Sequence, residues 1–145
     1  LREQRFAARM PLAAVQRRLM PEALRGVISP RDLPALRALD QLRPVLAQET
    51  WGVTGSAGFE LASGIEALHA ESDLDLMLRT PEPLARGEAE DLLAMLDRAE
   101  CAVDLQLQTP FGAVALREWA SGSRRVLLKT ASGAHLVLDP WQAVA

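Results

Sequence analysis

Two strongly alternating segments carry acidic side chains that an ordinary buried strand would not carry. Asp73 and Asp75 alternate with leucines in DLDLMLR (73–79), and Asp104 does the same in AVDLQLQT (102–109). Because successive side chains of a strand point to opposite faces, Asp73 and Asp75 share one face, roughly 6–7 Å apart. If the second strand lies beside the first with its leucines also in the core, Asp104 joins them. The spacing therefore predicts three crowded carboxylates on one sheet face.

Three crowded carboxylates repel one another and raise one another's pKa values. A divalent cation relieves this repulsion, and a site made only of oxygen ligands favours Mg²⁺ or Mn²⁺. Two such ions, about 4 Å apart, can stabilise both the entering and the leaving oxygen at a phosphorus atom. We therefore expect Asp73, Asp75 and Asp104 to be the catalytic and metal-binding residues of a site with two ions.

A Gly-Ser pair precedes these strands, at the end of the short β-prone run WGVTG (51–55). Gly55 allows a phosphate group to approach the backbone closely. Ser56 offers a hydroxyl and a backbone N–H at the start of a short helix, where the amides and the helix dipole favour an anion. Two basic residues, Arg79 and Lys129, lie at predicted strand ends and could neutralise a polyphosphate. We predict that these four residues bind substrate phosphate.

Other motifs with similar residues do not fit the sequence. An EF-hand needs Asp or Asn and then Gly soon after its Asp-x-Asp, whereas Met77 and Leu78 follow here. A P-loop needs Gly-Lys-Ser/Thr, which is absent. A strand with a solvated polar face would explain Asp-Leu-Asp-Leu alone, but it gives no reason for the upstream Gly-Ser pair or for Asp104.

The rest of the pattern predicts the elements that hold these segments. Helical spacing indicates helices at 11–19 and from Pro30 to about Leu46, the second with Ser29 as its N-cap. A helix from Ser56 ends at Gly64, and an amphipathic helix at 88–99 separates the two acidic strands. Residues 112–122 read as a further helix, and 124–139 as a β-hairpin. The prediction is a mixed α/β (α+β) sheet with its helices on one side, divided into an N-terminal helical segment (1–49) and a catalytic core (50–145).

Composition bounds the class of protein. The 145 residues suffice for one domain with a substantial core, and no apolar run approaches a membrane span. We expect no signal peptide and, from the single cysteine Cys101, a cytoplasmic protein. Residues 1–50 carry nine arginines against five acidic residues, net +4, whereas 51–145 carry a net −7. The basic segment suggests an acidic partner, and there is no signature of nucleic-acid binding.

The order of Gly55-Ser56, Asp73-Leu-Asp75 and Asp104 resembles the nucleotidyltransferase fold of DNA polymerase β-like enzymes, although the gap after the Gly-Ser pair is longer here than in many members. A more extensive resemblance covers most of the chain. Five segments look like the family of phosphoribosyl-dephospho-CoA transferases of bacterial malonate decarboxylase, also called malonate decarboxylase holo-acyl-carrier-protein synthases. They are RFAARMPLAAVQRRLMPEAL, WGVTGSAGFELASG, ESDLDLMLR, VDLQLQTPFGAVALREWA and VLLKTASGAHLVLDPW.

This resemblance implies a reaction. The 2′-(5″-phosphoribosyl)-3′-dephospho-CoA prosthetic group passes from its triphosphoribosyl precursor to a serine of the decarboxylase's acyl carrier protein, and pyrophosphate leaves. Asp73 and Asp75 would hold the metals on the triphosphate, and Asp104 would serve the nucleophile as base or metal ligand. Gly55 and Ser56 would hold the departing phosphates. Family members carry sequence before the region that matches Leu1, so we expect an N-terminal part to be absent here.

Two alternatives stay open at this point. A nucleotidyltransferase of the same fold would place AMP on a protein or a small molecule. A non-catalytic module would bind polyphosphate or a carrier protein, although a binder has no need of a third carboxylate.

Overall fold

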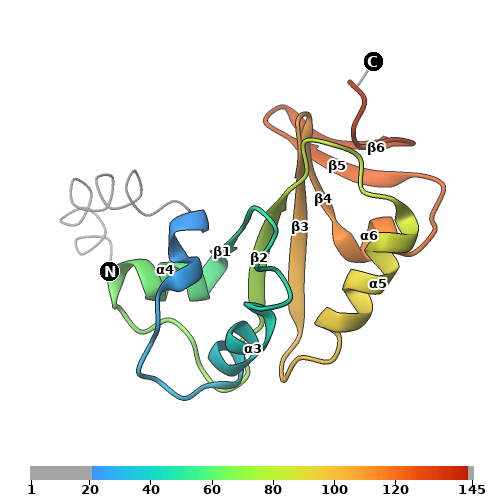
Figure 1. Cartoon of the computed structure of the whole chain (residues 1–145). Helices are drawn as coiled ribbons and strands as arrows, with labels where there is room; N and C mark the ends of the chain where they lie inside the picture. The colour runs from blue at the N-terminus through green and yellow to red at the C-terminus, as the bar shows by residue number, and fades with distance from the viewer. Residues whose placement is uncertain (1–20, 144–145) are drawn as a thin grey trace.

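The computed structural model describes residues 21–143. One six-stranded mixed sheet runs through this region in the order β1-β2-β3-β4-β5-β6 (Figure 1). Only β2 and β3 run parallel, and α5 makes the crossover that a parallel pair requires. The strands are β1 (Trp51–Thr54), β2 (Leu74–Arg79), β3 (Val103–Thr109), β4 (Gly112–Ala115), β5 (Val126–Thr130) and β6 (Gly133–Val137). The helices are the 3₁₀ helix η1 (Pro21–Gly26), α3 (Pro34–Leu42), α4 (Gly55–Ser63), α5 (Arg86–Leu96) and α6 (Leu116–Ala120).

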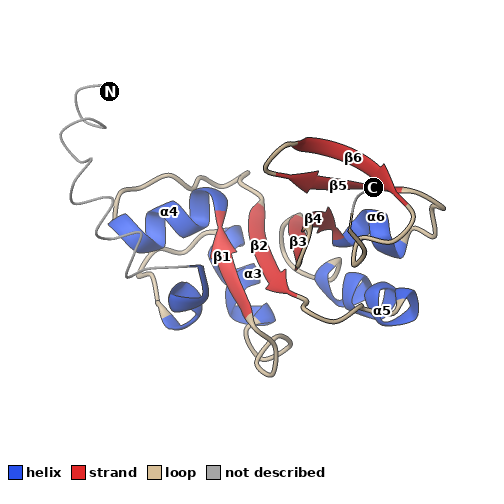
Figure 2. Ribbon diagram, turned by 90° about the horizontal axis from the view of Figure 1, so that it is seen from above, coloured by secondary structure: helices blue, strands red, loops and turns tan. Residues whose placement is uncertain are grey.

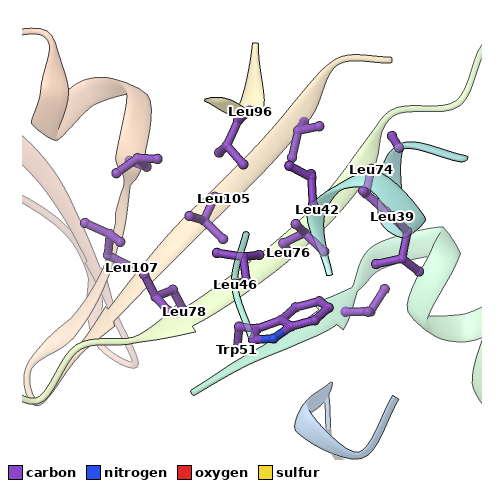
Figure 3. Packing of buried hydrophobic residues seen from close by; sticks show 14 of the residues in the cluster. Leu39, Leu42, Leu46, Trp51, Leu74, Leu76, Leu78, Leu96, Leu105 and Leu107 are labelled. Atoms are coloured by element: carbon purple, nitrogen blue, oxygen red, sulfur yellow. The ribbon is translucent and has the colours of Figure 1, made fainter. Parts of the chain in front are cut away.

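One face of the sheet forms the hydrophobic core. The leucines of β2 and β3 on this face are at most 3% exposed, because strand alternation sends every second side chain to it. Figure 3 shows them packed with leucines of α3 and α5 and with Trp51 of β1. Leu24 of η1 and Leu46 belong to the same buried cluster. The segment before β1 therefore shares a single core with the sheet.

The helices are spread over both sides of the sheet. Figure 2 shows α4 beside β1, while α5 and α6 lie together near β3 and β4. On the face opposite the core, the backbone of Pro21 in η1 lies where a Cβ of Gly52 would be. Met77, the register partner of Gly52, is buried there. The expectation of helices on one side only is therefore wrong, because Gly52 leaves room for η1 on the polar face.

Several predicted elements are confirmed. Strands lie at both acidic segments and at Trp51–Thr54, and the C-terminal hairpin is β5–β6. Gly64 ends α4 in the left-handed conformation, with φ 75°, as a C-terminal glycine is expected to do. No helix among residues 21–143 is both long and apolar enough to cross a membrane.

Helix α3 begins later than the sequence predicts. Leu33 is its N-cap and Pro34 its first residue, so Ser29 does not cap it. The residue before a proline is driven toward extended backbone, and Leu33 has φ −130° and ψ 152°. Ser29 Oγ instead accepts the N–H of Arg31 in a local turn. The helix predicted at 11–19 lies outside the described residues.

The prediction of one continuous helix at 112–122 is wrong. Residues Gly112–Ala115 form β4, and only the five residues of α6 are helical. Thr109 Oγ1 accepts the N–H groups of Phe111 and Gly112 and so closes a tight turn after β3. Val114 then pairs with Leu107 and is fully buried. Cross-strand packing decides this segment, since strand preference depends strongly on such context.

Leu76 lies at the centre of the core and is fully buried. We expect Leu76→Ala to lower the free energy of unfolding by about 2–5 kcal/mol, because lost apolar contact and the residual cavity add. Leu127→Ala on β5 is the matched control: Leu127 is 37% exposed, and its truncation should cost less than about 1 kcal/mol. Urea unfolding measures both, and equal losses would show that the core face is wrongly assigned.

Candidate active site

Three strand ends meet at one end of the sheet. Because β1 runs antiparallel and β3 parallel to β2, the last residue of β1 lies beside the first residues of β2 and β3. Thr54 is the register partner of Asp75, and Asp75 is the partner of Asp104. Directly paired residues on neighbouring strands project from the same face. Asp75 and Asp104 therefore lie side by side on the polar face.

The carboxylates here interact electrostatically. Burial of Asp75, followed by the charges of Asp104 and Asp73, raises the pKa of Asp75 above its ordinary value. Asp75 is half-buried, whereas Asp73 and Asp104 are exposed. The three acids predicted from sequence thus come within electrostatic reach of one another. Within residues 21–143, however, no three His, Cys, Asp or Glu side chains already surround a common point as a preformed metal cluster would.

The chemistry of this donor set nevertheless fits a hard divalent cation. Its ligands are carboxylate oxygens, which suit Mg²⁺ or Mn²⁺. Burial, and then the charges of Asp104 and Asp73, raise the pKa of Asp75, and a bound cation would offset the cost of keeping that carboxylate ionised.

Gly55 lies directly against Asp75. Its backbone has φ 62°, in the left-handed region, and a Cβ built on it would overlap Oδ2 of Asp75. Glycine is thus needed both for the conformation and for the space. Helix α4 begins at Gly55, and no side chain caps its first turn. The N–H groups of that turn, including that of Ser56, therefore stand at the same end of the sheet as the acids.

Lys129 is linked to Asp104 by two hydrogen bonds through Gln106. Lys129 Nζ donates to Gln106 Oε1 at 2.8 Å, and Gln106 Nε2 donates to Asp104 Oδ1 at 3.0 Å. The three side chains form a row across the polar face from β5 to the start of β3. Sequence reasoning missed Gln106, although its place two residues after Asp104 in an alternating strand was a usable signal.

Arg79 lies apart from this group. It is the last residue of β2, four residues beyond Asp75 and so roughly 13 Å along an extended strand. Its guanidinium is paired with Glu22 of η1, and this hydrogen bond is the main cause that lowers the pKa of Glu22. The structure brings Gly55, Ser56 and Lys129 toward the acids and leaves Arg79 at the other end of the strand.

A buried carboxylate anchors the loop that leads into β2. Glu60 of α4 is 5% exposed, and its Oε1 accepts the N–H groups of Ala67 and Leu68 and a guanidinium N–H of Arg31, at 2.6–2.9 Å. Burial alone would raise the pKa of Glu60, but these donors outweigh it and lower the pKa. The anchor fixes the chain between the Gly-Ser turn and Asp73.

A pocket of about 310 Å³ opens beside the start of β3, between α5 and α6. Aliphatic side chains from both helices line it, together with three charged residues that include two of the site acids: Leu93, Leu96, Leu116, Asp73, Asp104 and Arg117. Arg117 is held by an ion pair with Asp97, Nη2 to Oδ1 at 2.6 Å.

Comparison with known proteins places this chain in a family. Residues 22–140 match the model described as phosphoribosyl-dephospho-CoA transferase MdcG C-terminal domain. This chain belongs to that family. The family predicted from the sequence segments is thereby confirmed, as is the prediction of an enzyme of the transferase class. The matched region contains the whole sheet, the first turn of α4 and all three site acids.

Named relatives align along nearly the whole chain. It is 61% identical over 142 residues to a phosphoribosyl-dephospho-CoA transferase of Pseudomonas fluorescens (strain Pf0-1), covering 97% of this chain and 69% of the relative. Identity is 58% over 146 residues with the protein of that name from Pseudomonas aeruginosa (strain PAO1), covering 97% and 69%. The phosphoribosyl-dephospho-CoA transferase of Azotobacter vinelandii (strain DJ) is 54% identical to this chain over 151 residues, which cover 99% of this chain and 71% of the relative. No solved structure gives a significant match.

We expect Gly55→Ala to remove transferase activity, because the added Cβ displaces the Asp75 carboxylate that it would overlap. Gly64→Ala is the matched control: Gly64 also has a positive φ, 75°, but nothing lies within 4 Å of its added Cβ. Both substitutions should lower the free energy of unfolding by about 1–2 kcal/mol from backbone strain alone. Activity and urea unfolding measured together separate the two effects, and an active Gly55→Ala enzyme would contradict the close contact.

We expect Asp75→Asn to stabilise the protein at neutral pH. A carboxyl whose pKa is raised in the folded state binds more protons there than in the unfolded chain, so its contribution to stability falls as pH rises through the folded pKa. The advantage of the variant should therefore be present at pH 7 and should vanish below the ordinary aspartate pKa of 3.8. Thermal unfolding between pH 3 and pH 8 tests this. A variant less stable than the wild type at pH 7 would show that the ionised Asp75 carboxylate is not destabilised by its burial and its neighbours.

Proposed function

We propose that this protein transfers the 2′-(5″-phosphoribosyl)-3′-dephospho-CoA group from its triphosphoribosyl precursor to a serine of the malonate decarboxylase acyl carrier protein, releasing pyrophosphate. The pairing of Asp75 with Asp104 beside Gly55, in a chain of this transferase family, carries the proposal. We also propose a nucleotidyltransferase-like core of the DNA polymerase β type. The meeting of the Gly-Ser turn and both acidic strands at one sheet end supports it.

In this proposal the first turn of α4 and Lys129 bind the triphosphate of the donor. The uncapped N–H groups of Gly55 and Ser56 would donate to the β- and γ-phosphates, where the positive end of the helix dipole favours them. Lys129, held by Gln106 beside Asp104, supplies a positive charge on the same face. Arg79 has no part in this proposal because it is paired with Glu22 at the far end of β2.

The three aspartates would act on the reacting atoms, by taking up a proton and by holding metal ions. The serine Oγ attacks the α-phosphorus, the bond from this phosphorus to the oxygen bridging to the β-phosphate breaks, and pyrophosphate leaves with that electron pair. Asp104 takes the serine proton, since it is exposed and is oriented by the hydrogen bond from Gln106. Asp73 and Asp75, with Asp104, would hold Mg²⁺ (or Mn²⁺), two ions in this proposal, which supplies charge neutralisation at the triphosphate. We propose that the reaction takes place in the cytoplasm, where the carrier protein and the donor would meet.

The test is mass spectrometry of the carrier protein after incubation with this protein, the triphosphoribosyl donor and Mg²⁺. We expect the mass of the prosthetic group on one serine. Asp75→Asn and Asp104→Asn should each slow transfer by about 10²-fold or more, whereas Asp91→Asn, an exposed acid on α5, should not.

Two further arms complete this test. Replacement of the donor by ATP should give no adduct, and an AMP adduct would instead favour the alternative nucleotidyltransferase. Mg²⁺ should raise the melting temperature of the wild type and not that of Asp75→Asn. This second readout reports on metal binding without depending on turnover.

A further inference from the structure

The pocket between α5 and α6 has no role in the transfer chemistry, yet it adjoins the residues that carry it out. Asp73 and Asp104 line it as well as belonging to the acidic group. Residues 103–105 of β3 precede its pairing with β4, which begins at Gln106, and Val103, Asp104 and Leu105 all line the pocket. The pocket therefore opens around the start of β3, next to the place where the triphosphate would bind.

The lining of the pocket has the character of a site for an uncharged ring with polar edges. Its walls are aliphatic side chains, among them Leu93, Leu96 and Leu116. A triphosphate would not enter such walls, because an unpaired charge removed from water carries a large free-energy cost. Arg117 offers guanidinium donors, which suit the ring nitrogens of a purine. Asp73 and Asp104 also line the pocket, but in the proposed reaction their carboxylates serve the metal ions and the serine proton.

The volume selects one part of the donor. At about 310 Å³, the pocket is near the lower end of the usual range for small-molecule sites, roughly 300–1,000 Å³. It can hold a nucleobase but not the whole of dephospho-CoA with its long pantetheine arm. The ion pair of Arg117 with Asp97 joins α6 to the residue after α5 at the pocket.

We propose that this pocket binds the adenine base of the dephospho-CoA half of the donor. The inference rests on the function proposed above and adds to it the subsite that recognises the nucleoside. The base packs between the leucines of α5 and α6, the two sugars pass the start of β3, and the triphosphate extends over the polar face toward Gly55.

Ala102 provides the test. It lines the pocket and is itself exposed, so a larger side chain there fills pocket space without entering the core. Ala102→Leu should weaken binding of 3′-dephospho-CoA, measured by isothermal titration calorimetry, by roughly 10- to 200-fold. Ala94→Leu, an exposed alanine on α5 outside the pocket, should change it less than about twofold. Leu93→Phe enlarges another residue that lines the pocket and serves as a second variant, with thermal unfolding as the check that both are folded.

The results separate this proposal from the proposed function. Asp75→Asn should lose transfer but bind 3′-dephospho-CoA as the wild type does, since Asp75 does not line the pocket. Undiminished binding in folded Ala102→Leu and Leu93→Phe, or no binding by the wild type, would overturn the base subsite even if transfer is observed. A rise in KM for the carrier protein instead of the donor would also overturn it. Pocket-dependent binding without any transfer by the wild type would uphold the subsite and reject the proposed reaction.

Discussion

Asp75 and Asp104 face each other because β2 and β3 run parallel in a register that pairs them directly. An ionised Asp75 is unfavourable there, because its burial and then the charge of Asp104 raise its pKa. The pairing persists because the same register aligns Leu74 with Val103 and Leu76 with Leu105 on the buried face. A slip of one residue would exchange the two faces and bury the carboxylates. The hydrophobic core therefore determines where the acids stand.

The surroundings of the acidic pair are fixed by local devices of different kinds. Gly55 has no Cβ, and this leaves space for the Asp75 carboxylate beside the backbone. The hydrogen bonds of Glu60 hold the loop before β2. The row from Lys129 through Gln106 ties the acids to β5. Of these devices the Glu60 anchor carries a burial cost, which its three hydrogen-bond donors outweigh.

The sequence predicts those features that depend on a strand's own period. Alternation alone places Asp75 and Asp104 opposite buried leucines, and the five family segments indicate the transferase family. The sequence does not predict which strands pair with each other or which of their ends lie side by side. Arg79 and Lys129 both lie at predicted strand ends, yet only Lys129 shares a hydrogen-bonded row with Asp104. The four residues of β4 are likewise decided by pairing across a turn, which no local pattern in Gly-Ala-Val-Ala expresses.

The start of β3 is where the two proposed halves of the donor site meet. Asp104 points to the polar face and Leu105 to the core, so consecutive residues of one strand border both the acidic group and the pocket. A donor with a triphosphate at one end and a nucleobase at the other has the same two-sided character. Attachment of the base in this pocket would restrict the motion of the α-phosphorus relative to Asp104, and such positioning lowers the entropic part of a reaction barrier. On this view the aliphatic pocket contributes to the rate through geometry, while the acids contribute through charge.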